Sequence, residues 1–147
     1  MNIQVTKLNE KAILPQYQTA GAAGMDIHAC IDDTILLQPM ERRMIPTGFA
    51  MAVPTGYEAQ IRARSGLSIK HGITMINGVG TIDADYRGEV GVLLVNLGQD
   101  SFEITPDMRI AQLVIAKHEH AVWQEVVQLE ISERAEGGFG STGTHIA

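Results

Sequence analysis

The densest group of acidic side chains lies in residues 80–89, whose sequence is GTIDADYRGE. The carboxylates of Asp83, Asp85 and Glu89 could bind a hard cation or deprotonate a water molecule. Asp and Gly are also common turn residues, and Arg87 could neutralise a neighbour. By itself the segment is therefore more typical of a hairpin than of an active site. Tyr86, three residues after Asp83, adds a flat ring that a bound ligand could contact.

A second candidate site lies in residues 63–68 (ARSGLS), where a predicted strand ends at Arg64 and a short helix begins at Ser65. An arginine fork beside the free N–H groups of a helix start is suited to binding phosphate. A capped short helix next to a solvated arginine is the alternative interpretation.

The glycine-rich end of the chain, residues 131–147, could supply several backbone N–H groups to one anion, with the hydroxyls of Ser141 and Thr142 nearby. No lysine follows its glycines, and no strand and helix flank them, so it is not a P-loop. Phe139 has no core to join within this segment and could stack on a base, a contact of about 1–3 kcal/mol in single-strand binding proteins. A disordered terminus is the alternative interpretation.

Single polar residues elsewhere give weaker signals. Asp26 is the one acid in the apolar segment 22–29, and it could bind a metal directly, bind it through water, or cap a turn. His118 and His120 would share one face of a strand, but with no third ligand in sight we do not expect a metal there. We expect Cys30 to be a small buried hydrophobic residue.

Short stretches with period-two alternation recur along the chain and predict the β-strands that must position these residues. The first contains Ile3, Val5 and Thr6, and the others span residues 57–64, 90–96, 109–116 and 121–129. Turn signals separate them, at residues 46–48, 54–56, 97–100 and 106–107. Only residues 65–71 could form a helix, with Ser65 as its N-cap and Gly72 as its stop. Many short strands at such spacing indicate a β-sandwich or barrel.

The composition fits one soluble domain. The chain has 147 residues, of which 45% are hydrophobic and 19% charged, so it can bury a core without disulfides. The net charge of −6 and the lack of a basic stripe argue against nucleic-acid binding. No apolar run is long enough to span a membrane, and we read no signal peptide. With a single cysteine, which favours a reducing compartment, we expect a cytoplasmic protein.

Taken in order, five segments resemble the five signature motifs of the trimeric dUTPase family. They are AGMD at 23–26, RSGLS at 64–68, NGVGTIDADYRG at 77–88, RIAQL at 109–113 and RAEGGFGSTG at 134–143. The resemblance covers nearly the whole chain, and the third and fifth segments are its most specific parts. It implies an all-β, jelly-roll-like fold with one short helix, a β core over residues 1–130 and a flexible C-terminal arm over residues 131–147. It also implies a homotrimer whose active sites lie between subunits.

The activity implied by the resemblance is hydrolysis of dUTP to dUMP and pyrophosphate, with Mg²⁺ on the triphosphate. This reaction would keep uracil out of DNA and supply dUMP for dTMP synthesis. Asp83 resembles the catalytic general base of the family, and Asp26 the aspartate that holds Mg²⁺ through water. The matching substrate-binding residues are Arg64, Ser65, Gly66 and Gln112 on the phosphate side, Asn77, Gly80, Thr81 and Ile82 at the uracil edge, Tyr86 against the sugar, and Arg134, Phe139, Gly140, Ser141 and Thr142 in the arm.

Three positions depart from the commonest family pattern without removing a functional group: Met25, Ser68 and Ala135. Related alternatives are a dCTP deaminase, which shares the fold, and a dUTPase-like regulator that binds nucleotide or protein without turnover. The run at 83–86 and the aromatic, glycine-rich arm favour triphosphate hydrolysis over deamination. A purely structural β-sandwich would not account for Asp83, Arg64, Tyr86 and the arm occurring together.

Overall fold

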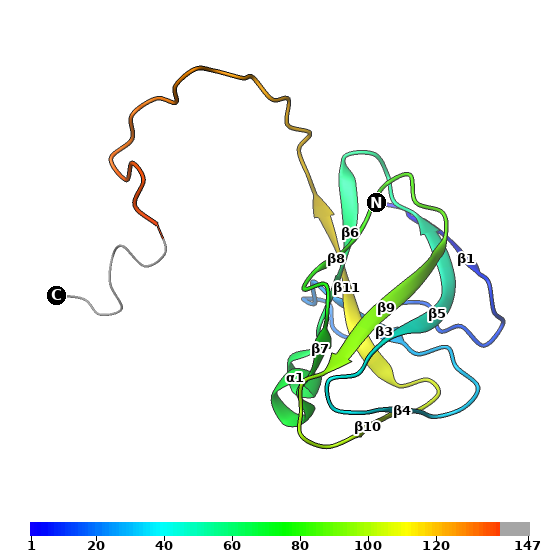
Figure 1. Cartoon of the computed structure of the whole chain (residues 1–147). Helices are drawn as coiled ribbons and strands as arrows, with labels where there is room; N and C mark the ends of the chain where they lie inside the picture. The colour runs from blue at the N-terminus through cyan, green and yellow to red at the C-terminus, as the bar shows by residue number, and fades with distance from the viewer. Residues whose placement is uncertain (139–147) are drawn as a thin grey trace.

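A computed structural model describes residues 1–138 of the chain. They form an all-β body with one short helix, which confirms the predicted fold class (Figure 1). The elements, in chain order, are β1 (Gln4–Lys7), β2 (Gln16–Tyr17), β3 (Met25–His28), β4 (Ile35–Leu37), β5 (Arg42–Ala52), β6 (Tyr57–Arg62), α1 (Ser65–His71), β7 (Ile73–Met75), β8 (Gly80–Ile82), β9 (Glu89–Asn96), β10 (Phe102–Ile104) and β11 (Arg109–Lys117).

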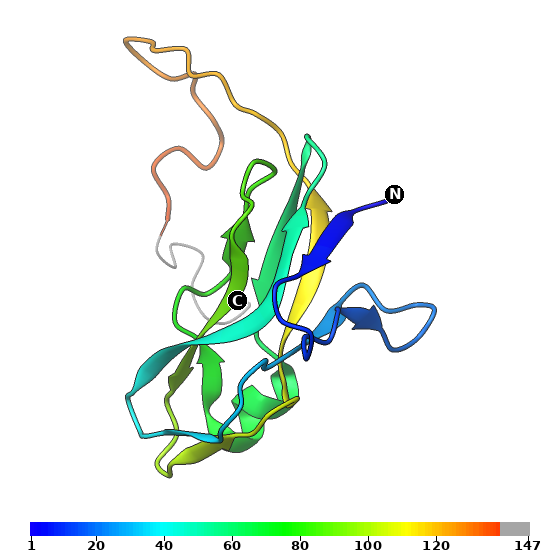
Figure 2. The same ribbon diagram turned by 90° about the vertical axis from the view of Figure 1, so that its right-hand side faces the viewer.

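The strands form two main antiparallel sheets and one small one (Figure 2). The four-stranded sheet has the order β1-β5-β9-β7, and the five-stranded sheet has the order β2-β3-β11-β6-β8. A two-stranded sheet of β10 and β4 completes the body. Strands β7, β8 and β9 follow one another in sequence, but β8 pairs with β6 while β7 pairs with β9. Residues 80–89, which by themselves are typical of a hairpin, therefore cross from one sheet to the other.

Both main sheets contribute to one hydrophobic core. In β9, Val90, Val92 and Leu94 are buried at alternate positions, which is the periodicity that predicted the strand. Ile27 of β3 and Leu113 of β11 join the same cluster from the five-stranded sheet. Each such side chain contributes about 1.5–3 kcal/mol relative to an exposed one. The core thus fixes the two sheets, and with them the loops that carry the motifs.

Helix α1 has the predicted extent and the predicted stop. Gly72 ends it in the left-handed region at φ 69°, and its N–H donates to the Ser68 carbonyl at 3.0 Å. The prediction that Ser65 caps the helix is wrong. Arg64 is the N-cap, in an extended conformation, and no side chain within residues 1–138 caps the helix. Ser65 is already the first helical residue, so its hydroxyl is not placed to cap the free N–H groups.

Residues 46–48 do not form the predicted turn between strands. They lie inside β5, where the register with β9 moves from Pro46↔Gly91 to Ala50↔Glu89. Three residues, 47–49, therefore lie opposite the single residue Val90, which makes a β-bulge with two extra residues in β5. Its Gly48 has φ 72°, a conformation that favours glycine.

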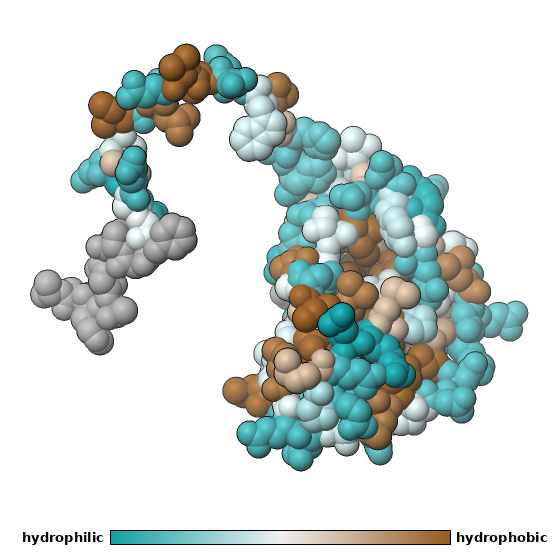
Figure 3. Space-filling view, viewed as in Figure 1, coloured by the Kyte–Doolittle hydropathy of each residue, from teal (hydrophilic) through white to brown (hydrophobic). Residues whose placement is uncertain are grey.

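The C-terminal segment, residues 118–138, leaves the end of β11 and runs away from the body (Figure 1). The strand predicted at 121–129 is wrong for this chain, because residues 119–136 are all exposed and none of them is paired. Trp123 is 94% exposed, and Val122 and Val127 are fully solvated, so apolar side chains are exposed among hydrophilic ones along the segment (Figure 3). Within residues 1–138 no helix is long and apolar enough to cross a membrane.

Candidate functional site

Asp83 lies one residue past β8, with its carboxylate exposed. The following turn is tightly held: the Tyr86 N–H donates to the Asp83 carbonyl at 3.2 Å. The Arg87 guanidinium donates from Nη1 to the carbonyls of Ala84 and Tyr86, both at 2.7 Å. Arg87 therefore stabilises the turn backbone rather than neutralising Asp83 or Asp85. The result is an exposed carboxylate on a rigid support.

A pocket of about 270 Å³ opens beside this turn. Its lining includes all six residues that the sequence placed around the base, the sugar and the attacking water: Asn77, Gly80, Thr81, Ile82, Asp83 and Tyr86. The remaining wall comes from β5, β6 and β9, through Met44, Ile61, Glu89, Val90, Gly91 and Leu93. These wall residues were not predicted, because their part in the pocket depends on how the two sheets pack. An apolar wall facing a few polar groups is typical of a small-molecule site.

Tyr86 presents its ring to this pocket. Its hydroxyl donates to the Glu89 carbonyl at 3.0 Å, and the residue is 45% exposed. The ring lies directly over Gly88, where an added Cβ would be 2.6 Å from the ring carbon Cζ. Position 88 therefore requires glycine for the ring to stay where it is.

A second cluster gathers at the junction of β3, β11 and the end of β6. Asp26 forms ion pairs with Arg64 (Oδ1 to Nε, 3.3 Å) and with Arg109 (Oδ2 to Nη1, 3.2 Å). The Arg64 Nη1 also donates to the Arg109 carbonyl at 2.8 Å. The Asp26 side chain is only 12% exposed, whereas 49% of Arg109 is open to solvent. Two guanidinium groups around one carboxylate leave an excess positive charge, which suits a phosphate.

Gln112 lies beside this cluster, opposite Asp26 in the β11–β3 register and opposite Arg62 in the β11–β6 register. Its Nε2 donates to the Ala63 carbonyl at 2.9 Å. An added Cβ on Gly24 would collide with the Gln112 amide, so the glycine leaves room for it. The structure thus brings together Asp26, Arg64 and Gln112, with Ser65 and Gly66 next in the chain at the start of α1.

His28, two residues from Asp26, does not add charge to the cluster. Burial lowers the pKa of its imidazole below the ordinary value of 6.5, so the ring is neutral at pH 7. Its Nδ1 is buried without a hydrogen-bond partner among the described residues. The charge of the cluster therefore comes from Asp26, Arg64 and Arg109 alone.

The described residues contain no cluster of three or more His, Cys, Asp or Glu side chains that could hold a metal by themselves. The rings of His118 and His120 are 5.1 Å apart, and no third ligand joins them within residues 1–138. Asp26 is already engaged by two arginines, so its carboxylate fits a contact through a metal-bound water better than direct coordination. Mg²⁺ commonly keeps several waters and takes its other ligands from substrate phosphates.

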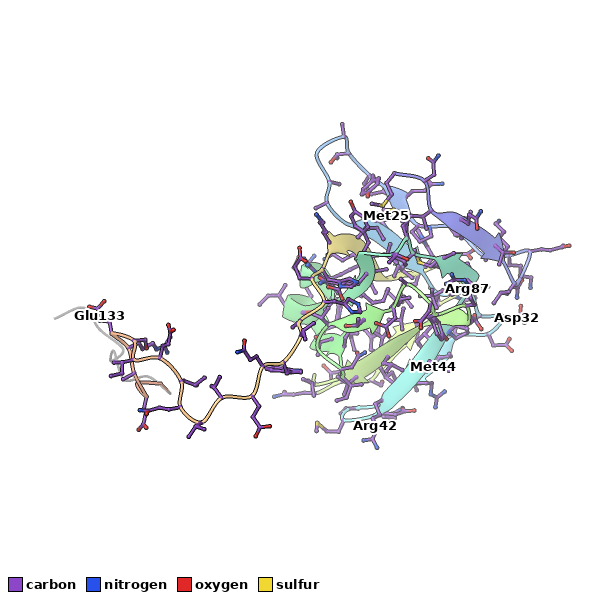
Figure 4. The ribbon with its side chains drawn as sticks, turned by 90° about the horizontal axis from the view of Figure 1, so that it is seen from above. Met25, Asp32, Arg42, Met44, Arg87 and Glu133 are labelled. Atoms are coloured by element: carbon purple, nitrogen blue, oxygen red, sulfur yellow. The ribbon has the colours of Figure 1, made fainter. Side chains whose placement is uncertain are left out.

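The two clusters lie far apart in one chain. Ile82 pairs with Ala59, which puts Asp83 level with Glu58, six residues before Arg64 along an extended backbone. At about 3.3 Å per residue the separation is roughly 20 Å. Met25, the neighbour of Asp26, and Met44 of the pocket lie well apart in Figure 4. None of Asp26, Arg64, Ser65, Gly66 and Gln112 lines the Asp83 pocket.

Of the residues expected in the arm, only Arg134 is among the described residues. Arg134 lies in the C-terminal segment, where its Nε donates to the Gly137 carbonyl at 2.7 Å. The labelled neighbour Glu133 lies far from the body in Figure 4. Phe139, Gly140, Ser141 and Thr142 lie outside the described residues.

The family model for dUTPase matches residues 10–143, which is most of the chain. This chain belongs to the dUTPase family. It is 58% identical over 134 residues to the deoxyuridine 5'-triphosphate nucleotidohydrolase of Desulfotalea psychrophila, covering 91% of this chain and 89% of that one. It is 50% identical over 143 residues to the enzyme of the same name from Syntrophotalea carbinolica, covering 97% of each. Its activity is therefore that of a dUTP diphosphatase, a hydrolase of nucleotide metabolism that acts on dUTP.

Solved structures of dUTPases have the same fold. The dUTPase of Staphylococcus bacteriophage 80alpha with dUpNHpp aligns with a TM-score of 0.84 and 31% identity over 97% of this chain and 98% of that one. A mutant of that enzyme, also with dUpNHpp, gives a TM-score of 0.88 at 29% identity over 97% and 98%. A mutant dUTPase from phage phi11 of S. aureus, in which a structural Mg(II) ion is coordinated, gives a TM-score of 0.80 at 26% identity. The alignment covers 89% of this chain and 100% of that one.

Proposed function

We propose that Asp83 is the general base that deprotonates the water attacking the α-phosphorus of dUTP, releasing dUMP and pyrophosphate. Its exposed carboxylate stands at the edge of the pocket beside Tyr86 and Thr81, on a turn held by three hydrogen bonds. Phosphoryl chemistry depends mainly on positioning and charge stabilisation, with little covalent help from the protein. A carboxylate on a rigid turn meets the positioning requirement.

We assign recognition of the uracil base to β8. Among the described strands, β8 is at the edge of its sheet and pairs with β6 on one side only. The backbone groups on its other side, over Gly80 to Ile82, are free to hydrogen-bond the uracil edge together with Asn77. Backbone amides cannot rotate to suit cytosine, and mispaired buried polar groups are costly.

Sugar recognition falls to Tyr86, whose ring we place against C2′ so that a ribose hydroxyl has no room. The ring is fixed at its hydroxyl by Glu89 and packed over Gly88. Rejecting an added hydroxyl through a steric clash needs a ring that does not move aside.

The phosphates would bind the second cluster, at Arg64, Ser65, Gly66 and Gln112, with Mg²⁺ held through water by Asp26. The excess positive charge of the two arginines and the solvent-facing guanidinium of Arg109 support this assignment. When bound, Mg²⁺ would neutralise part of the triphosphate charge, which lets an acidic protein of net charge −6 bind dUTP.

We further propose a homotrimer whose active sites are shared between subunits. None of the residues assigned to the phosphates lines the pocket of about 270 Å³, so the triphosphate would extend beyond it. The phosphate cluster of the same chain is roughly 20 Å away, farther than a triphosphate reaches. A second chain would bring its own cluster to the pocket.

The arm of a third chain would then close the site, with Arg134, Ser141 and Thr142 at the γ-phosphate, Phe139 over the uracil and Gly140 at the substrate. Residues 118–130 belong to the core in this arrangement because other chains cover them, and residues 131–147 form the arm. The exposed apolar side chains of Val122, Trp123 and Val127 support this assignment, since none of residues 1–138 covers them.

Trp123 provides a test of the trimer, because it is the only tryptophan in the chain. We expect a light-scattering mass of about three times the chain mass of 15.9 kDa. The fluorescence of Trp123 should be blue-shifted relative to a solvated indole, and should shift to the red when the oligomer is dissociated. A particle of single-chain mass with red-shifted emission would contradict the trimer.

The proposed biological role is to keep uracil out of DNA and to supply dUMP for dTMP synthesis, in the cytoplasm. A free thiol at Cys30 suits a reducing compartment. It is half-buried rather than fully buried as expected, and burial raises its pKa.

The metal and the substrate range can be tested in one assay of pyrophosphate release from dUTP, dCTP, dTTP and UTP. We expect release from dUTP alone, loss of activity with EDTA, and recovery when Mg²⁺ is added back. Full activity in EDTA would show that hydrolysis does not require the metal. Ammonia released from dCTP would indicate the deaminase instead, and dUTP binding without turnover a regulator.

A further inference from the structure

We propose that Thr47 and Glu89 are positioning residues for Tyr86, and that the bulge in β5 thereby sets how strongly the enzyme rejects ribonucleotides. The inference rests on the proposed role of Tyr86 at the sugar. Neither residue is expected to react with the substrate. Their effect passes through a series of hydrogen bonds from the core to the tyrosine hydroxyl.

The first bond joins the bulge to β9. Thr47 is fully buried, and its hydroxyl donates to the Val90 carbonyl at 2.6 Å. Thr47 and Asn96 are the only polar residues buried to this degree among the described residues. A buried hydroxyl needs a hydrogen-bond partner. Here the partner is a backbone carbonyl of β9, the strand whose first residues line the pocket.

The second bond runs in the same direction, from a donor in β5 to an acceptor in β9. The Gly48 N–H donates to the Glu89 carboxylate (Oε1) at 2.8 Å. Charge-assisted hydrogen bonds of this kind are roughly twice as strong as neutral ones. Thr47 and Gly48 together therefore hold both of the first two residues of β9.

The third bond reaches Tyr86. The backbone carbonyl of Glu89, whose side chain is held by the bulge, accepts the Tyr86 hydroxyl at 3.0 Å. The ring is thus fixed at its base by the Asp83 turn and at its tip by β9. If β9 shifts at Glu89, the tip of the ring shifts with it.

The bulge itself is held from the side away from the pocket. The Gly48 carbonyl accepts the Leu8 N–H at 2.7 Å and the Asn9 N–H at 3.2 Å, while the Pro46 carbonyl accepts the Cys30 N–H at 2.9 Å. Side chains of Cys30 and Ala12 pack so close to Gly48 that a Cβ there would be 2.6 Å from the sulfur. The bulge is therefore a rigid support for the start of β9, and through β9 for the Tyr86 ring.

The test compares dUTP and UTP by the ratio of their kcat/KM values. Thr47→Val keeps the side-chain shape but removes the donor to Val90. We expect the ratio to fall by roughly 3- to 10-fold, less than the roughly 100-fold cost of a full ångström of misplacement. Thr47→Ser, which keeps the hydroxyl, should restore it. Should Thr47→Val not fold, Glu89→Ala at the exposed side chain tests the same bond series.

Ser68→Ala is the matched control, because the Ser68 hydroxyl also donates to a backbone carbonyl, that of Ile73 at 3.0 Å, away from the pocket. It should lower stability without changing the ratio. If Thr47→Val and Ser68→Ala lower stability alike and both leave the ratio unchanged, Thr47 is structural only and the inference is wrong.

Tyr86→Ala and Tyr86→Phe separate this inference from the proposed function. If Tyr86→Ala leaves the ratio unchanged, the sugar role of Tyr86 fails. If Tyr86→Ala lowers the ratio and Thr47→Val does not, only the positioning role fails. In the Tyr86→Phe background, which lacks the hydroxyl, Thr47→Val should have no further effect on the ratio. An equal effect in both backgrounds would overturn the bond series.

Discussion

Replacing Asp83 by asparagine is expected to lower kcat by about 10²–10⁴-fold, the usual contribution of a general base. This corresponds to about 2.7–5.4 kcal/mol of barrier at 1.36 kcal/mol per decade. Asparagine keeps the size and the hydrogen-bonding reach of the side chain but cannot accept a proton from water. The turn that carries it is held through backbone groups and Arg87, so the geometry of the pocket should persist. Binding of dUTP, measured by titration calorimetry, should therefore change little.

Asp85→Asn is the matched control for this substitution. Asp85 lies in the same turn and is also exposed, but it does not line the pocket. The same loss of charge at this position should leave kcat within about threefold, since surface substitutions have small effects. Near-normal turnover in Asp83→Asn, or an equal loss in both variants, would contradict the proposed role of Asp83 as the general base.

The elements that could be predicted are those specified by local sequence. Helix α1 was expected over residues 65–71 and has that extent, because a left-handed glycine at 72 ends it whatever surrounds it. The alternation in 90–96 and 109–116 likewise gave β9 and β11 within one residue. Such signals need no knowledge of the partner strand. The grouping of Asn77, Asp83 and Tyr86 in one pocket followed from their closeness along the chain.

Features that depend on pairing between distant segments could not be predicted. The ion pair of Asp26 with Arg109 joins residues 83 positions apart and arises from the β3–β11 register. The sequence PTG at 46–48 carries the same turn signal as the PTG at 54–56, yet only the second connects two strands. The first became a bulge because β9 pairs with β5 both before and after it. Composition alone cannot distinguish these outcomes.

The strand predicted at 121–129 shows a different limit. The alternation is real, and it leaves Trp123, Val127 and Leu129 exposed in the single chain. A period-two pattern indicates that one face will be covered, but not by which chain. In the proposed trimer the covering surface belongs to another subunit, which is also how the two site clusters would meet.

Deleting residues 134–147 is expected to lower kcat/KM for dUTP by roughly 100-fold or more, because removing even one donor to the transition-state charge costs about 10²–10³ in kcat. The body should keep its fold, since residues 119–136 make no strand pairing with it. Trp123 remains in the truncated chain, so its emission and the light-scattering mass report whether the oligomer is intact. Normal turnover by the truncated enzyme would show that the arm assignment is wrong.

Mixing the two inactive variants then tests whether the arm acts on another subunit. Asp83→Asn chains keep their arms, and chains lacking residues 134–147 keep Asp83. If a site takes Asp83 from one chain and its arm from another, refolding a 1:1 mixture should restore about a quarter of the sites, as random assembly of a closed ring requires. Each chain refolded alone is the control and should stay inactive. If each arm closes the site of its own chain, every site in the mixture lacks one part, and no activity returns.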